Sequence, residues 1–241
     1  FNNINYITDR KGTSTSVILN DKVVAPTGTD VEEQFKFIKK HIKFGVSDTL
    51  FSDAVIFVEG ITENAILPYY ISEDSELKHR YITIVKIDGA HAFVYDNLLK
   101  TLGIPAAFIT DLDIKRSDVE KNAFTPINSL VGRETTNKTI EYFYGTKNIE
   151  KVTWPITSGN IAVFFQDCYD SLYRTSFEES FISKNKDNDI VNTVLKEVKP
   201  NIYNQILGST LDYNNNSNNA YEWQRKLADS KSEFANLILY K

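Results

Sequence analysis

The chain has 241 residues, of which 41% are hydrophobic, and its formal net charge is -5 at pH 7. This length and apolar content are enough for one large domain, or one and a half, with a real core. The single cysteine, Cys168, excludes an internal disulfide, favours a reducing cytoplasm and is expected to be a small buried residue. No apolar run reaches the length of a membrane span. The absence of methionine indicates a piece of a longer protein.

The first fifty residues predict a hairpin followed by a helix. Tyr6–Thr8 and Ser16–Leu19 have the composition of short strands, and Gly12 supplies the turn between them. Asp30, three residues before Glu33, forms a capping box that predicts a helix behind it. This segment is incomplete as a domain of its own.

Beyond residue 50 the sequence alternates between strands and helices. Ala54–Val58 and Ala106–Ile109 read as fully buried strands, and Tyr81–Ile87 is rich in β-forming residues. A helix begun or kinked near Pro68 is expected after the first strand, and a second helix at Phe93–Leu102 is stopped by glycine and proline. Alternating βαβ units predict an α/β fold with a parallel sheet and right-handed crossovers.

The second half of the chain has a looser pattern. Ile161–Phe165 is expected to form a strand, and the asparagine-rich stretch Asp212–Asn219 is interpreted as a low-complexity loop. The last helical stretch starts near Ala220. Its inward residues are expected to be Trp223, Leu227, Phe234 and Leu237.

Four acidic residues follow the two buried strands. Glu59 comes directly after the first strand, and Glu63 falls in the first turn of the next helix. Asp111 and Asp113 follow the other strand and point to one side if the backbone there is extended. The ends of parallel strands meet at one edge, which in open α/β sheets is the ligand crevice. Four like charges there repel unless a cation lies between them, and oxygen ligands favour Mg²⁺ or Mn²⁺ over zinc.

These acids also have ordinary explanations. Glu59 and Glu63 can serve a helix N-terminus, where the dipole stabilises carboxylates. An Asp-x-Asp pair alone also occurs in sugar-nucleotide transferases and in haloacid-dehalogenase-type phosphatases. Those families lack the upstream Glu-Gly-x-x-Glu strand, so the combination is more specific than either part.

The motif Val58-Glu59-Gly60-x-x-Glu63, taken with Asp111-x-Asp113, resembles the TOPRIM domain of topoisomerases, primases and overcoming-lysogenization-defect (OLD) nucleases. Within that group, the stretch from residue 51 to residue 113 is most similar to the OLD nucleases. These include the nuclease subunit of the Gabija anti-phage system.

Two later segments also resemble the OLD family. Thr175-Ser176-Phe177-Glu178 is similar to its Ser-x-Glu metal motif, and the segment beginning at Lys231 is similar to the one that bears its catalytic lysine. Ser176 can equally be a helix N-cap, and most lysines are surface charges. The histidines are too scattered for a metal site or triad and are interpreted as structural: His41, His79 and His91.

The resemblance implies a fold and a domain organisation. The expected fold class is α/β, a TOPRIM (Rossmann-like) parallel sheet flanked by helices, with a helical insertion or C-terminal extension. Residues 51–241 would form the TOPRIM nuclease domain, and residues 1–50 would be the C-terminal tail of an ABC-type ATPase domain. ATP would bind only through that upstream domain, because the phosphate-binding motif is missing from this sequence.

The resemblance also implies an activity, which is a DNA endonuclease or nickase that uses two Mg²⁺ or Mn²⁺ ions and acts in anti-phage defence. The implied ligands are Glu63, Asp111 and Asp113 for one ion, and Glu59, Ser176 and Glu178 for the other. Glu59 and Asp111 would be catalytic together with Lys231, which would stabilise charge on the scissile phosphate. The implied partners are double-stranded DNA, further copies of the protein in a dimer or tetramer, and a UvrD-like helicase subunit, without a membrane.

Two other functions stay open. A topoisomerase or primase TOPRIM domain would need a tyrosine or primase domain elsewhere, and an inactive TOPRIM module would only scaffold a defence complex.

The net charge of -5 is unexpected for a nucleic-acid protein, because duplex binding usually rests on a basic patch. Local runs of basic residues, ordinarily solvated helix faces, are Lys36, Lys39, Lys40 and Lys43, and Lys115, Arg116 and Lys121.

Overall fold

The computed structural model describes residues 4–10, 12–19, 32–33, 36, 47–87 and 92–241. The strands are β1 (Ile4–Arg10), β2 (Thr13–Leu19), β3 (Ala54–Val58), β4 (Ile82–Lys86), β5 (Ala106–Ile109), β6 (Ile156–Ser158), β7 (Ile161–Phe164), β8 (Cys168–Tyr169) and β9 (Leu172–Tyr173). The α-helices are α3 (Ile61–Glu73), α4 (Asp96–Leu102), α5 (Asp118–Asn122), α6 (Lys138–Tyr144), α7 (Phe177–Lys184), α8 (Asp189–Val198), α9 (Pro200–Leu207), α10 (Asn214–Asn218), α11 (Ala220–Lys226) and α12 (Lys231–Tyr240). Short 3₁₀ helices are η1 (Ser47–Phe51), η2 (Leu77–His79) and η3 (Ala92–Tyr95).

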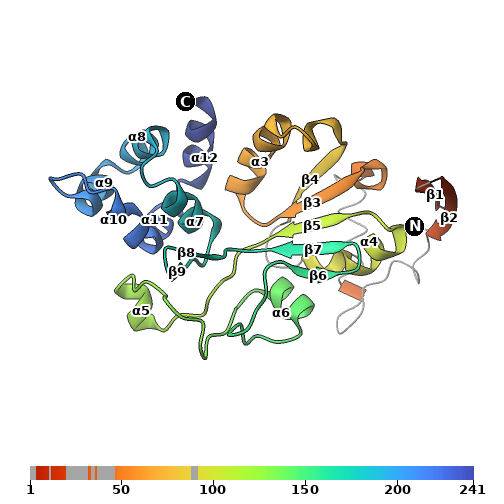
Figure 1. Cartoon of the computed structure of the whole chain (residues 1–241), viewed down its shortest axis with the longest axis horizontal. Coiled ribbons are helices and arrows are strands. Elements are labelled where there is room, and N and C mark those ends of the chain that lie inside the picture. Colours follow the sequence, from red (N-terminus) through yellow and green to blue (C-terminus); the bar gives the residue numbers. More distant parts are fainter. Residues whose placement is uncertain (1–3, 11, 20–31, 34–35, 37–46, 88–91) are drawn as a thin grey trace.

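The centre of the molecule is a sheet with the strand order β4-β3-β5-β7-β6. Its first four strands are parallel and β6 is antiparallel to β7. Phe57 and Phe108 are fully buried in adjacent strands, and their rings lie 5.0 Å apart. Such apolar strands need cover on both faces, which the helices in Figure 1 supply. The predicted α/β class, with a mainly parallel sheet flanked by helices, is therefore confirmed.

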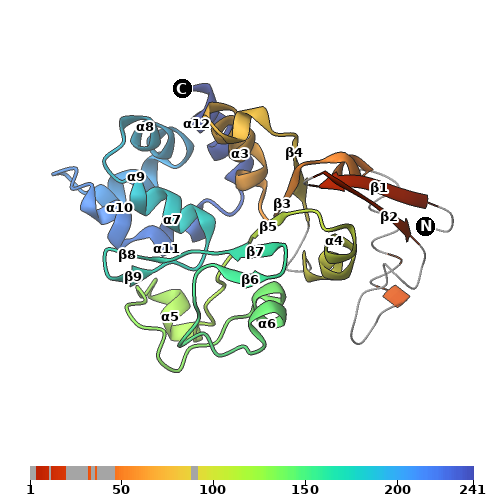
Figure 2. The ribbon, with the colours of Figure 1, turned by 45° about the vertical axis from the view of Figure 1, so that its right-hand side comes forward.

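The last quarter of the chain forms a second unit, the helical lobe, which comprises α7 to α12. It has its own core, in which Leu195, Trp223, Leu227 and Phe234 are fully buried. Figures 1 and 2 show this lobe at the end of the sheet where β3 and β5 lead into α3 and α5. The inward positions predicted for the last helical stretch are confirmed, with Leu237 partly buried.

The hairpin predicted near the N-terminus is confirmed. β1 pairs antiparallel with β2, and Gly12 has the positive φ of 75° that the turn requires. The helix predicted behind Asp30 lies mostly outside the described residues. The assignment of residues 1–50 to an ATPase domain stays a prediction. Within the described ranges, no helix is both long and apolar enough to cross a bilayer.

Other predictions about local structure were wrong. The asparagine-rich stretch contains α10, because Asn216 is buried and accepts a hydrogen bond from the Trp223 indole at 3.0 Å. Cys168 is exposed, since it lies in the short hairpin of β8 and β9. The helix begins at Ile61 and not near Pro68, which lies inside α3, while the alternative of a kink at Pro68 stays a prediction. Arg116 is not on a solvated face but is only 7% exposed.

The separate core of the helical lobe allows a stability test on α8. Leu195→Ala should lower the free energy of unfolding by about 2–5 kcal/mol, because it removes methyl groups from a fully buried site and leaves a cavity. Ile190→Ala on the same helix is the control, since Ile190 is 41% exposed and should cost less than about 1 kcal/mol. Urea unfolding measures both. Equal losses would contradict this description of the core.

Candidate functional site

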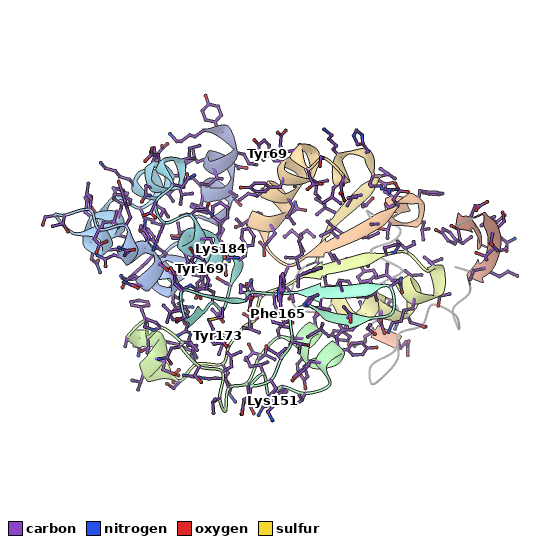
Figure 3. All side chains as sticks on the ribbon, viewed as in Figure 1. Tyr69, Lys151, Phe165, Tyr169, Tyr173 and Lys184 are labelled. Atoms are coloured by element: carbon purple, nitrogen blue, oxygen red, sulfur yellow. The ribbon has the colours of Figure 1, made fainter. Side chains whose placement is uncertain are left out.

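Three neighbouring parallel strands end at the same edge of the sheet. In their register Val58 lies opposite Ile109, and Ile109 lies opposite Phe164. The residues that follow the strands therefore reach this edge together, as Glu59 does after β3 and Asp111 after β5. Figure 3 shows Phe165, the residue after β7, where the sheet meets the helical lobe. The edge predicted to be a ligand crevice therefore faces the helices.

Asn137 connects the acids at this edge, and sequence reasoning missed it. Its side-chain nitrogen lies 2.7 Å from the Thr110 hydroxyl, 3.2 Å from the Glu59 carboxylate and 3.4 Å from the Asp113 carboxylate. It is fully buried, and its side-chain oxygen caps α6 by accepting from the Thr139 and Ile140 amides. The cap was readable from Asn at a helix start, but no sequence signal links it to the acids.

Asp111 is held between the sheet and the helical lobe. Its Oδ1 accepts hydrogen bonds from the backbone N–H of Phe177 at 2.9 Å and from the Gln166 amide at 3.0 Å. Asp113 has a φ of 47°, so the backbone is not simply extended through the Asp-x-Asp pair as expected. Its N–H donates to the carbonyl of Thr175 at 3.0 Å. Gln166, also missed from the sequence, follows β7.

Glu63 lies in the first turn of α3, as predicted, and is only 2% exposed. Its Oε2 has no hydrogen-bond partner among the described residues. Burial raises the pKa of Glu63 to about 7, and the nearby charges of Glu178 and Glu59 act in the same direction. A Cβ at Gly60 would lie 2.0 Å from this oxygen, so glycine lets the side chain fold back against the backbone.

The pKa values of the Asp111 and Asp113 carboxyls are raised for the same reasons. Burial, followed by the charges of Glu63 and Asp113, raises the pKa of Asp111 well above its usual range. Burial and the charge of Glu59 raise the pKa of Asp113 to about 6. Each of these carboxyls is therefore easier to protonate than an exposed one, and each would be stabilised in its charged form by a nearby cation.

Lys231 and Glu178 form an ion pair at the border of the helical lobe. The Lys231 Nζ lies 3.0 Å from Glu178 Oε2, and the Thr62 hydroxyl donates to Glu178 Oε1 at 2.8 Å. Burial alone would lower the pKa of Lys231, but the charges of Glu178, Asp111 and Glu63 raise it above its ordinary value. The pair thus joins α7 and α12 to the start of α3.

Ser176 has the N-cap role that was considered as the alternative to metal binding. It is the N-cap of α7, and its hydroxyl accepts from the Glu179 N–H at 3.4 Å. It lies beside Phe177, whose N–H binds Asp111. Ser176 is therefore next to the acids, while its hydroxyl bonds to its own helix.

The predicted site residues lie in one region of the structure. Their charges shift one another's pKa values, and the residues concerned are Glu59, Glu63, Asp111, Asp113, Glu178 and Lys231. In the described part of the chain, no three acidic, histidine or cysteine side chains converge tightly enough to hold a cation as they stand. The donor set nevertheless fits a hard cation, because every acid in it offers carboxylate oxygens and one buried oxygen of Glu63 has no partner in the described ranges. Ligation would require side-chain rotation.

Comparison with known proteins gives one family match and one curated relative. Residues 50–113 match the family described as overcoming lysogenization defect protein-like, TOPRIM domain. The whole chain is 44% identical over 247 aligned residues to Endonuclease GajA of Bacillus cereus (strain HuB5-5). The alignment covers 100% of this chain and 36% of that relative, so the chain spans about a third of the relative's length. No solved structure matches.

The raised pKa of Glu63 predicts that this site costs stability at neutral pH. A carboxyl with a folded pKa of about 7 instead of 4.5 destabilises the fold increasingly as the pH rises from 4.5 to 7. In chelator at about pH 8, Glu63→Gln should therefore be more stable than wild type by on the order of 3 kcal/mol. The advantage should vanish below about pH 4.5, where both states of wild type hold the proton.

Thermal unfolding across this pH range measures the effect. Glu73→Gln is the matched control, because Glu73 is exposed at the other end of the same helix. A gain for Glu63→Gln that did not depend on pH would show that ionisation of this carboxyl is not the cause.

Proposed function

We propose that the chain is the catalytic part of a metal-dependent DNA endonuclease or nickase, because residues 50–113 match the OLD-like TOPRIM family and the chain is 44% identical to Endonuclease GajA. The observation that carries the proposal is the gathering of buried carboxyls at the sheet edge, with raised pKa values and a lysine beside them. A fold alone does not imply a reaction, but this constellation supplies the groups that phosphodiester hydrolysis needs.

Two Mg²⁺ or Mn²⁺ ions are the proposed cofactors. When bound, they would supply Lewis acidity that stabilises the attacking and leaving oxygens of an in-line displacement. Glu63, Asp111 and Asp113 are the proposed ligands of one ion, and Glu59, Glu178 and Ser176 those of the other. Ser176 is the weakest of the set, because its hydroxyl would have to leave the cap of α7.

The remaining groups act by position and charge. Asn137 is proposed as a positioning residue, because one buried amide reaches both Glu59 and Asp113. Lys231 would stabilise negative charge on the scissile phosphate, and Glu178 and Thr62 fix where its ammonium lies. A histidine base is not required by this arrangement.

The wider context is also a proposal. Residues 1–50 would continue from an ABC-type ATPase domain that binds ATP, and that region would assemble the protein into a dimer or tetramer. Double-stranded DNA is the proposed substrate, and a UvrD-like helicase is the proposed partner in anti-phage defence. These assignments rest on the relationship to GajA, of which this chain covers 36%.

Asp111→Asn tests the site directly. The variant should lose metal-dependent cleavage of duplex DNA by at least about 100-fold while keeping its fold, because a neutral amide is a poor ligand but preserves shape. Single-turnover cleavage by the full-length protein measures it. Asp187→Asn, at an exposed position between α7 and α8, is the control and should cut like wild type. Wild-type rates for Asp111→Asn would refute the assignment.

Lys231 separates charge stabilisation from metal binding. Lys231→Ala should reduce the cleavage rate by roughly 10²- to 10³-fold, by analogy with the loss of one oxyanion donor. Affinity for Mn²⁺ should not fall, because Glu178 loses its competing ammonium. Lys231→Arg should rescue only in part, since its planar group differs in shape and reach.

Calorimetry with Mn²⁺, run beside the cleavage assay, distinguishes the two effects. Lys184→Ala is the control, because Lys184 lies on the same lobe beside the Tyr169 ring (Figure 3). Loss of Mn²⁺ affinity in Lys231→Ala, equal to its loss of rate, would instead make Lys231 a support of the metal ligands.

A further inference from the structure

A cavity of about 280 Å³ opens beside the acids. It lies between the segment that follows β5, α5 and α11, and Figures 1 and 2 both show α5 next to the helical lobe. Asp113 lines it and so connects it to the candidate site. Its basic lining residues are Lys115, Arg116, Lys121 and Arg225, and Asp113 is the one acid that lines it in the described part of the chain.

The positive charge of this cavity is built into the fold. Arg116 is only 7% exposed, its guanidinium lies 3.8 Å from the centre of the Tyr221 ring, and it donates to the carbonyl of Thr125. Glu179 offsets part of its charge from the buried side. A guanidinium fixed in this way cannot be explained as a mobile surface charge.

The cations nearer the solvent are held weakly. Lys115 pairs with Glu134 at 2.9 Å and Lys121 with Asp118 at 3.3 Å, but both pairs are exposed and are worth little in water. Arg225 is exposed and has no ion pair with any acid in the described ranges. These side chains are therefore available to an anion that enters the cavity.

We propose that this cavity binds the phosphodiester backbone of the DNA strand next to the scissile phosphate. The inference rests on the proposed nuclease function. A chain with a net charge of -5 and a cluster of buried acids repels DNA, so cations close to the site are needed to hold the strand there. Arginine and lysine are the usual phosphate ligands, and such contacts fix register without reading sequence.

The test uses the full-length protein and a short duplex DNA in chelator, so that binding is measured without cleavage. Arg225→Gln and Lys115→Gln should each weaken binding about tenfold. A plot of the logarithm of the association constant against the logarithm of the salt concentration has a negative slope. Each variant should reduce the magnitude of that slope by about 0.9, the value for one lost phosphate contact, and the double variant by about twice that. Both side chains are exposed, so the fold should be unaffected. Lys196→Gln, exposed on α8, is the control and should change neither quantity.

The outcomes distinguish the cavity from the reaction. If wild type binds and cuts DNA while Arg225→Gln and Lys115→Gln keep its affinity and salt slope, the cavity assignment is wrong and the proposed function stands. If wild type cuts DNA with Mg²⁺ but does not bind it in chelator, the cavity assignment is also wrong; if wild type neither binds nor cuts DNA, both proposals fail. A free mononucleotide can be added as a competitor for the bound duplex. If it competes as strongly as unlabelled duplex at the same concentration of phosphate groups, the cavity binds a free phosphate ligand and the DNA proposal is overturned.

Discussion

The structure depends on the burial of like charges at one edge of a sheet. Glu63, Asp111 and Asp113 are all shifted toward protonation, first by burial and then by their acidic neighbours. Burying charges without partners is costly, so the fold supplies the Asn137 amide, the Gln166 amide and the Phe177 N–H. The two separate hydrophobic cores must outweigh the remaining cost. This imbalance is what a bound cation would relieve.

The site belongs to both lobes. The matched TOPRIM segment, residues 50–113, contributes Glu59, Glu63 and the two aspartates. The helical lobe contributes Glu178, Lys231 and the Phe177 N–H, and the carbonyl of Thr175 just before it holds the backbone of Asp113. Relative movement of the lobes would therefore change the distances between the acids and the lysine. Because α12 packs closely against α3, such a movement would have to shift these two helices relative to each other.

Sequence reasoning succeeded where local chemistry decides the structure. The bounds of β3 and β5 follow from short apolar runs, and Glu63 falls in the first turn of α3 because Gly60 is the N-cap of that helix. It failed where distant residues decide. Asn137 lies far along the chain from Glu59, and Arg116 is buried because Tyr221 covers its guanidinium, which no periodicity indicates. Cys168 is exposed because hairpin geometry overrides its usual preference for the interior.

Charge balance bears on the number of ions. When ionised, the five carboxylates of Glu59, Glu63, Asp111, Asp113 and Glu178 face the single ammonium of Lys231, which leaves four negative charges that two divalent cations would neutralise. Glu178 can take part without releasing Lys231, because its two oxygens offer about four acceptor positions and use two of them here. The ammonium of Lys231 and the two ions would then each neutralise part of the charge of one acidic cluster. Since raised pKa values leave some of these groups protonated near neutral pH, binding of the ions would release protons.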